Sequence, residues 1–308
     1  MLSAVRRRWV VLGPLALFLL ACTSASLRPD RPIDCASCAE WNRSQEPIQV
    51  FGNTYYVGMA GVSAVLIVSD DGHILLDGAL PQSAPLIDAN IRKLGFRAED
   101  IRVIVNSHAH YDHAGGIAAL QRASGATVVA SEAGARALEN GEPTPDDPQF
   151  GFGPELTRFP AIRQVRAIAD GESLTVGDVT LTAHLTAGHT PGSTSWTWRA
   201  CEKTGCLNIV YADSLSPVSA PGFRFTGDAR TAGIIDTYWS SIETVAKLPC
   251  DILLTTHPGV SGLIEKLALR MADPGSNPFI DAGACRAYAE TAARRLERRI
   301  AEEASEAG

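Results

Sequence analysis

The sequence predicts an α/β fold in which two mixed β-sheets lie face to face and helices cover both outer surfaces, a four-layer αββα sandwich. Two observations carry this prediction. Short β-rich segments are followed by helical segments, and this order of strands and then helices occurs twice along the chain. The 308 residues, 45% of them apolar, are also enough to bury one large core. We therefore expect a single domain over 48–308, built from two similar halves.

The first 21 residues are expected to be a signal peptide. Three arginines at 6–8 precede an apolar run of about a dozen residues, which is too short for an ordinary transmembrane helix of about 20. The tetrapeptide LLAC at 19–22 resembles the lipobox of bacterial lipoproteins, in which the cysteine is acylated. Ordinary cleavage near Ala25 is the alternative. Either outcome predicts export to the periplasm, with membrane attachment only through a lipidated Cys22.

The first half of the domain is expected to begin near Ile48, because residues 22–47 are polar and proline-dotted and are typical of a flexible tail or linker. Four short strands separated by turn residues predict an antiparallel meander: Ile48–Phe51, Thr54–Val57, Val62–Val68 and Ile74–Asp77. Helices and strands then alternate: a helix at Gln82–Leu94, a strand at Ile101–Asn106, a helix at Gly115–Ala123, a strand at Thr127–Ala130 and a helix at Glu132–Leu138. The Gly- and Pro-rich loop Asn140–Pro160 has a length that is more often functional than accidental.

The second half restarts with strands bounded by turn residues and returns to helices. The expected strands are Ser173–Val176, Val179–Ala187, Thr194–Trp198 and Asn208–Ala212. They are followed by a helix at Thr231–Lys247, a strand at Ile252–Thr255, a helix at Gly262–Met271 and a terminal helix at Arg286–Glu303.

The charge pattern argues against a nucleic-acid partner. The formal net charge is −7, and the charged residues, 20% of the chain, are scattered rather than grouped. Without a basic face there is no surface that would attract a polyanion.

The motif HAHYDH at 108–113 is the strongest chemical signal in the sequence. It lies between a predicted strand and a predicted helix, where α/β sheets place their sites. In an extended segment His108 and His110 point the same way, whereas Asp112 and His113 begin the turn into the helix and aim at a second point. Histidine and aspartate suit zinc, whose catalytic sites take three protein ligands and leave a position for water. Two adjacent metal sites are therefore expected.

Two further histidines are the best candidates to complete these sites. His189, in AGHTPG, and His257, in TTHPG, each follow a buried strand directly. His184 lies on the polar face of its strand and His73 follows an Asp-Gly turn, so both are interpreted as ordinary solvated or hydrogen-bonded histidines.

Four motifs give the chain a family resemblance: HAHYDHAGG, AGHTPGSTSWTW, YADSLS and LPCDILLTTHPG. On them the chain resembles the metallo-β-lactamase superfamily and, within it, subclass B3 β-lactamases, from about Pro47 to Glu297. The first two motifs are superfamily-wide and the last two are narrower. The resemblance implies the αββα fold of that family and a monomeric hydrolase that confers antibiotic resistance by opening the amide bond of penicillins, cephalosporins and carbapenems.

The resemblance also implies the site residues and two Zn²⁺ per chain. The first zinc would be held by His108, His110 and His189, and the second by Asp112, His113 and His257. Asp112 would in addition orient the metal-bound hydroxide that attacks the lactam carbonyl.

Residues on the substrate side follow from the same resemblance. Ser214 stands where subclass B1 has a zinc-binding cysteine, and Ser214 and Ser216 would bind the substrate carboxylate. Gln149 and Phe150, in the long loop, are further pocket candidates. Asp77 is interpreted as a residue that orients a ligand loop.

Seven cysteines, an odd number, require at least one that is not in a disulfide. Loss or lipidation of Cys22 leaves six. The resemblance implies a disulfide between Cys250 and Cys285 and a hairpin bridge between Cys201 and Cys206. Cys35 and Cys38 are left open, either paired or free, since a zinc site would need more ligands nearby. No cysteine is expected to bind zinc.

Two alternative functions remain at this point. One is another hydrolase of the same fold, a glyoxalase II-like thioesterase or a lactonase, in which a carboxylate bridges the metals. Asp213 could take that position, but we interpret Ser214 as the metal-side residue and Asp213 as structural. The other is a non-catalytic binding lipoprotein stabilised by zinc, which predicts closed zinc coordination.

Overall fold

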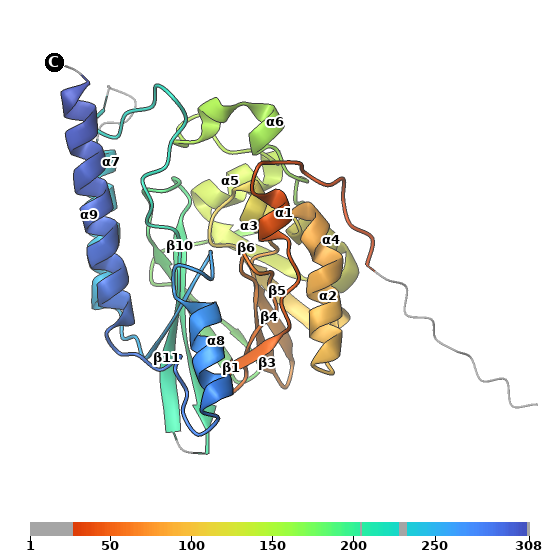
Figure 1. Cartoon of the computed structure of the whole chain (residues 1–308). Coiled ribbons are helices and arrows are strands. Elements are labelled where there is room, and N and C mark those ends of the chain that lie inside the picture. Colours follow the sequence, from red (N-terminus) through yellow and green to blue (C-terminus); the bar gives the residue numbers. More distant parts are fainter. Residues whose placement is uncertain (1–26, 204, 228–232, 307–308) are drawn as a thin grey trace, which may run out of the picture.

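The computed structural model describes residues 27–203, 205–227 and 233–306, and these form two facing sheets with helices on both outer surfaces (Figure 1). The predicted αββα sandwich is confirmed. The predicted signal peptide, 1–21, and the lipidation candidate Cys22 lie outside the described residues. In the part of the chain that is described, no helix combines the length and the apolar character needed to cross a membrane.

The first sheet has seven strands in the order of the chain. They are β1 (Ile48–Phe51), β2 (Thr54–Tyr56), β3 (Val65–Ser69), β4 (Gly72–Leu76), β5 (Ile101–Val105), β6 (Thr127–Ser131) and β7 (Val165–Ile168). The first four pair antiparallel as the predicted meander, and the last three continue the sheet in parallel. Strand β7 was not predicted. It is an edge strand with one fully buried residue, Ile168, so its sequence lacks an apolar run.

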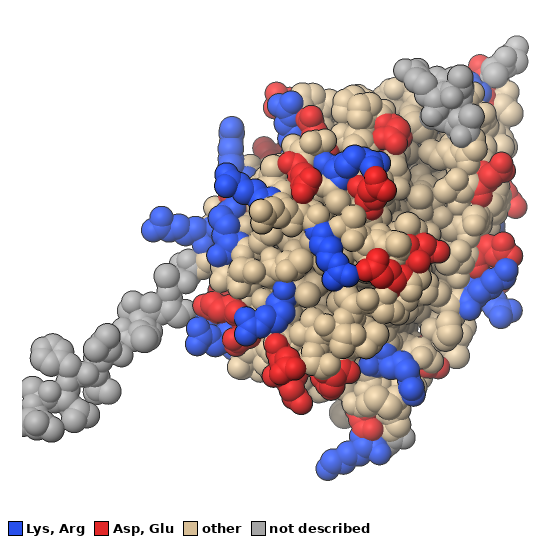
Figure 2. Space-filling model, turned by 180° about the vertical axis from the view of Figure 1, so that it is seen from behind, with Lys and Arg blue, Asp and Glu red and all other residues tan. Residues whose placement is uncertain are grey.

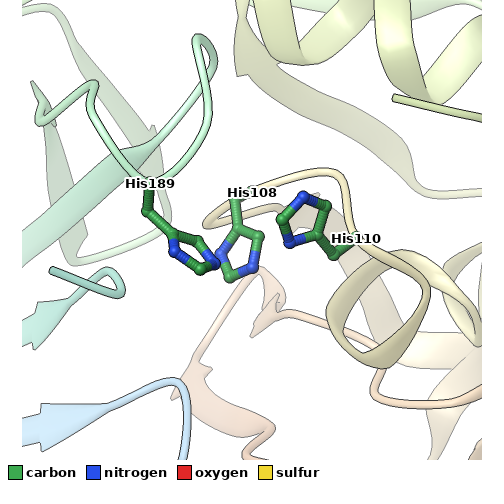
Figure 3. Close-up of side chains that lie close together, drawn as sticks. All are labelled: His108, His110 and His189. Carbon is green, nitrogen blue, oxygen red and sulfur yellow. The ribbon is translucent and has the colours of Figure 1, made fainter. Parts of the chain in front are cut away.

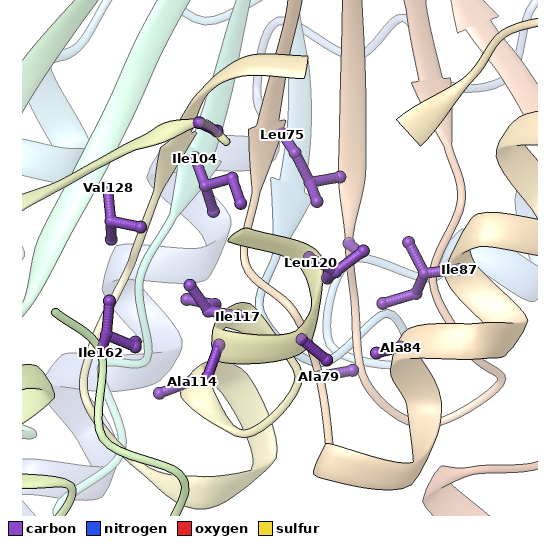
Figure 4. Packing of buried hydrophobic residues seen from close by; sticks show 14 of the residues in the cluster. Leu75, Ala79, Ala84, Ile87, Ile104, Ala114, Ile117, Leu120, Val128 and Ile162 are labelled. Atoms are coloured by element: carbon purple, nitrogen blue, oxygen red, sulfur yellow. The ribbon is translucent and has the colours of Figure 1, made fainter. Parts of the chain in front are cut away.

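Helices cover the outer face of this sheet and bury the first core. They are α2 (Ala84–Lys93), α3 (Tyr111–Ala114), α4 (Ile117–Ser124) and α5 (Glu132–Asn140), with the 3₁₀ turns η1 (Pro81–Ser83) and η2 (Ala98–Asp100). Figure 4 shows Leu75 and Ile104 of the sheet facing Ile117 and Leu120 of α4. Helix α2 stops where predicted, because Gly95 adopts φ +86°, a left-handed conformation that glycine tolerates without steric cost.

The second sheet has the order β12-β11-β10-β9-β8. Its strands are β8 (Ser173–Val176), β9 (Val179–Leu185), β10 (Thr194–Glu202), β11 (Gly205–Ala212) and β12 (Ile252–Thr255). Trp196 and Leu181 of this sheet pack against Tyr56 and Ile74 of the first sheet in the central core. Helices α7 (Ile234–Lys247) and α9 (Ala284–Ser305) cover the outer face over a third core that contains Tyr238 and Leu296. Helix α8 (Leu263–Ala272) follows β12.

Three disulfides join described cysteines. Cys250–Cys285 ties the start of β12 to the start of α9, and Cys201–Cys206 closes the β10–β11 hairpin. Both implied pairings are confirmed. The question left open for Cys35 and Cys38 is answered, because these two are also bonded to each other.

The expectation that order begins near Ile48 is wrong. Residues 27–47 pack on the domain and include the short helix α1 (Cys38–Trp41). The amide of Gln82 bonds the backbone N–H and C=O of Ile33, at 3.1 and 2.8 Å, and the ring of Trp41 lies 5.3 Å from that of His257. Long-range side-chain contacts therefore order a segment that has no periodicity of its own.

Candidate metal centre

Six side chains from four segments gather where strands end at one edge of the two sheets. His108 and His110 follow β5, Asp112 and His113 lie in α3, and His189 and His257 follow β9 and β12. The carboxyl ends of these strands point to the same edge, which is why residues distant in sequence meet there. The positions are those that the sequence predicted.

The first group comprises His108, His110 and His189. One ring nitrogen of each lies within 4.8 Å of the others, and all three side chains are buried. Figure 3 shows the rings converging from the β5–α3 segment and from the loop that carries His189.

Each of these rings is held at its other nitrogen by an oxygen. His108 Nδ1 lies 2.6 Å from Asp213 Oδ1, His110 Nε2 lies 3.2 Å from both oxygens of Asp147, and His189 Nδ1 lies 2.8 Å from the carbonyl oxygen of Ser216. Metal-binding histidines are usually oriented in this way, because the hydrogen bond fixes which nitrogen remains free. His108 Nε2 is buried and has no hydrogen-bond partner. An orphaned buried nitrogen of this kind fits a metal ligand.

The second group comprises Asp112, His113 and His257. Asp112 Oδ2 lies 3.2 Å from His113 Nε2 and 3.4 Å from His257 Nε2, and His257 Nδ1 donates to the carbonyl oxygen of Gly61 at 2.9 Å. Both ring nitrogens of His113 are buried without a hydrogen-bond partner. The ring of His113 lies 4.3 Å from that of His108, so the two groups are adjacent.

Burial and mutual repulsion favour uncharged imidazoles in the first group. Burial lowers the pKa of His189 to about 3, with a further lowering from His108 and His110. Burial, together with His113 and His110, holds the pKa of His108 well below its usual value. Neutral imidazole is the form that binds metals.

Elsewhere in the centre, contacts between carboxylates and histidines oppose the effect of burial on the pKa values. Burial raises the pKa of Asp112, but its contacts with His113 and His257 outweigh burial and hold that pKa well below its usual value. Likewise, burial lowers the pKa of His110 but Asp147 raises it overall. Asp112 therefore favours its ionised form, which can offset the charge of a cation.

Asp77 orients the loop that carries the first ligands, as the sequence interpretation proposed. Its carboxylate is fully buried and accepts hydrogen bonds from the backbone N–H and hydroxyl of Ser107, at 2.7 and 2.6 Å, from Asn106 Nδ2 and from Tyr211 Oη. These contacts fix the chain immediately before His108.

Three of the four substrate-side candidates contact a histidine of the two groups or the residue beside one. Ser214 Oγ lies 2.9 Å from the hydroxyl of Thr256, the residue before His257, and the Ser216 carbonyl holds His189. Gln149 Nε2 lies 3.4 Å from His189 Nε2. Phe150 is exposed, in the 3₁₀ turn η3 (Phe150–Phe152) that precedes α6 (Pro154–Thr157).

Two carboxylates in this centre were not predicted as functional. Asp147 carries no local signal beyond its place in a long Gly- and Pro-rich loop. Asp213 was interpreted as structural, and that interpretation needs correction, because its contact with His108 makes it an orienting residue.

The interpretation of His184 as a hydrogen-bonded histidine is confirmed by its contact with Thr197 Oγ1 at 2.8 Å. His73, the second histidine that was not expected to bind metal, packs edge-on against Phe96 away from the centre.

The donors fit a divalent metal ion. Imidazole nitrogens and one carboxylate, three donors to a group, match the ligand chemistry of zinc and leave positions for water. No cysteine of the described residues contributes, since all six are in disulfides.

Comparison with known proteins agrees with the family resemblance of the sequence motifs. The family described as the Metallo-beta-lactamase superfamily matches residues 57–202. Among solved structures, the Rm3 metallo-beta-lactamase is 49% identical with a TM-score of 0.84, and the alignment covers 88% of this chain and 99% of that chain. MEM-A1, a subclass B3 metallo-beta-lactamase isolated from a soil metagenome library, is 50% identical with a TM-score of 0.83, over 86% of this chain and 99% of that chain.

Another relative is named as an enzyme other than a β-lactamase. The hydroxyacylglutathione hydrolase of Anaeromyxobacter dehalogenans (strain 2CP-C) is 30% identical over 172 residues, which are 56% of this chain and 52% of that protein. The chain thus spans about half the length of this relative.

Proposed function

The chain belongs to the metallo-β-lactamase superfamily, and on that premise we propose that it is a zinc-dependent β-lactamase of the B3 type, which hydrolyses the amide bond of penicillins, cephalosporins and carbapenems. One observation carries the proposal: two adjacent three-donor groups contain no cysteine, and a serine, Ser214, bonds Thr256, the residue before the donor His257. Identity near one half over almost the entire length of two β-lactamases supports the same substrate class.

Two zinc ions would occupy the centre. His108, His110 and His189 would hold the first, and Asp112, His113 and His257 the second. Bound zinc supplies Lewis acidity, which acidifies a water molecule and polarises a carbonyl group.

The side chains of this protein supply orientation. The Asp112 carboxylate, fixed between His113 and His257, would accept a hydrogen bond from the attacking water and so direct it at the lactam carbonyl. The hydroxyls of Ser214 and Ser216 would bind the substrate carboxylate, and the Gln149 amide, close to His189, would contact the substrate at the rim.

A hydrolysis panel tests the proposal. Zinc-loaded protein should open a penicillin, a cephalosporin and a carbapenem, and chelation should abolish the reaction. Activity that survives chelation contradicts it, as does cleavage of a glutathione thioester without cleavage of any lactam.

The same panel tests the second candidate, a thioesterase or lactonase, which the hydroxyacylglutathione hydrolase similarity favours. That activity would require a carboxylate bridging the metals. Asp213 is the candidate. Its Oδ1 lies 2.6 Å from His108 Nδ1, which fits an orienting role, whereas its Oδ2 is buried without a hydrogen-bond partner, so the hydrolysis panel decides between the two roles.

We also propose that the protein is exported to the periplasm and acts there as a monomer. The signal-like N-terminus and three disulfides, which persist in oxidising compartments, support export. Mass spectrometry of the mature N-terminus distinguishes acylated Cys22 from cleavage near Ala25, and light scattering measures the oligomeric state.

A further inference from the structure

The segment after β11, residues 213–227, is hydrogen-bonded to α9 near its start and near its end. At its start, Tyr288 Oη donates to the carbonyl oxygen of Asp213 at 2.8 Å and accepts the backbone N–H of Leu215 at 2.9 Å. We call residues 217–226 the cleft loop; the preceding residue, Ser216, holds His189 through its carbonyl oxygen. The cleft loop is held by two charged residues near the C-terminal end of α9.

Arg299 bonds the cleft loop at several points. Its guanidinium donates to Ser219 Oγ at 2.8 Å and to the carbonyl oxygen of Phe223 at 2.9 Å, and it lies 5.2 Å from the ring centre of Phe225. Its Nε is paired with Glu303 Oε1 at 2.6 Å.

Glu303 bonds the end of the same loop. Only 3% of the residue is exposed, and its carboxylate accepts the backbone N–H groups of Phe225 and Thr226, at 2.9 and 2.8 Å, and the Thr226 hydroxyl at 2.7 Å. A buried carboxylate is costly unless it is both paired and hydrogen-bonded, and here both conditions are met by the cleft loop and Arg299. The conformation of the loop is therefore coupled to this ion pair.

The cleft loop also contacts the long loop that contains Asp147. The backbone N–H of Ala220 donates to the carbonyl oxygen of Pro148 at 2.9 Å. Between the two loops lies a cavity of about 280 Å³, lined on one side by Ala220 and Phe223 and on the other by Asp147 and Phe150. Asp147 in turn orients His110.

We propose that Arg299 and Glu303 are positioning residues, whose ion pair holds the cleft loop as one wall of the substrate cleft. The substrate class rests on the proposed β-lactamase function, whereas the positioning of the loop does not. The proposal predicts that breaking the pair weakens substrate binding without removing metal.

Hydrogen exchange tests the positioning directly. In zinc-loaded full-length protein, Arg299→Met and Glu303→Gln should each speed exchange of the Phe225 and Thr226 amides by about tenfold, while strand β5 stays protected. Arg298→Met is the matched control, because Arg298 is the exposed neighbour on the same helix. Exchange no faster than in this control would overturn the proposal.

Kinetics test the consequence. Arg299→Met should raise KM for a β-lactam about tenfold with kcat changed less than about threefold and zinc content unchanged, and Arg299→Lys should recover part of the loss. An unchanged KM, or a fall in kcat together with lost zinc, would count against the proposal. If Arg299→Met does not fold, Glu303→Gln and Arg299→Lys give the same two readouts. Failure of the wild-type protein to hydrolyse any β-lactam would refute the proposed function, and the exchange result would still decide the positioning.

Discussion

Contacts with oxygen atoms decide which ring nitrogen four of the five histidines present at the metal centre. Asp213, Asp147 and the carbonyl oxygen of Ser216 hold the rings of the first group, and the carbonyl of Gly61 holds His257. A ring with both nitrogens unrestrained could rotate or change tautomer, so these oxygens matter to metal binding although none of them belongs to either donor group.

Asp213→Asn tests this role at one residue. The amide keeps the shape but loses the negative charge at His108, so we expect zinc affinity to fall about 10- to 100-fold, measured by competition with a chelator. Asp178→Asn, at an exposed aspartate, is the control and should leave the affinity unchanged. Equal affinities in the two variants would contradict the assignment of Asp213.

Asp112→Ala tests the second group. Removal of the carboxylate that lies between His113 and His257 should abolish hydrolysis and lower the metal content from two ions per chain to one. Elemental analysis of the purified variant measures the content. Retention of both ions, or loss of both, would argue against separate sites.

Close packing between elements positions the loop that carries His189. Gly188 has φ +150°, and a Cβ atom there would lie 2.5 Å from the ring of Tyr238 in α7. Ser241 Oγ, also in α7, donates to the carbonyl oxygen of Ala187. Helix α7 therefore sets the path of the chain into this ligand.

Gly188→Ala should consequently destabilise the protein by about 1–3 kcal/mol in chemical unfolding and weaken zinc binding. Gly125→Ala is the matched control, since Gly125 also has positive φ but nothing lies within 4 Å of its Cβ position. Its cost should be limited to about 1 kcal/mol of backbone strain, with zinc binding unchanged. Equal effects in the two variants would show that the Tyr238 contact does not matter.

The contact between Glu303 of α9 and the cleft loop should also make the free energy of unfolding depend on pH. Burial raises the pKa of Glu303, but hydrogen bonds from Thr226, Phe225 and Arg299 outweigh burial and lower it below the usual 4.5. Because the folded-state pKa is depressed, the carboxylate stabilises the fold above about pH 4.5, and this stability is lost as pH falls through the folded-state pKa.

Glu303→Gln should therefore lower the free energy of unfolding at pH 7 and flatten its decline below about pH 4.5. Urea unfolding of both proteins across the acidic range gives the comparison. Parallel pH profiles of the two proteins would contradict a depressed pKa at Glu303.

At the scale of the whole molecule, charges of both signs share the side of the surface drawn in Figure 2. Figure 2 shows acidic and basic side chains interspersed over the side seen from behind. The absence of a polyanion partner stays a prediction from the sequence.

Disulfides stabilise the whole molecule to different degrees, because they close loops of different length. Cys250 and Cys285 are 35 residues apart, and Cys201 and Cys206 are 5 apart. From loop-closure entropy, replacing the first pair by alanines should cost about 4 kcal/mol and replacing the second about 2 kcal/mol. Denaturant unfolding of the two double variants measures this order. A larger loss from the hairpin pair would contradict the entropic argument.

Much of the fold could be predicted because its signals are local. The meander β1–β4, helix α2 with its glycine stop and the terminal helix α9 are encoded in apolar periodicity and turn residues within each segment. Strand β7 and helix α1 could not be predicted in this way, since they depend on a neighbouring strand and on side chains such as Gln82.

The sequence by itself determined the layered fold and the six candidate metal ligands, because four of the ligands lie in one hexapeptide and the other two directly follow buried strands. Only the tertiary structure decided which oxygens orient those ligands, and which residues hold the cleft loop. Asp147 and Asp213 act on histidines 37 and 105 positions away, and Arg299 and Glu303 act on a loop about 80 positions away. A contact across such a separation leaves no periodic or local trace in the chain.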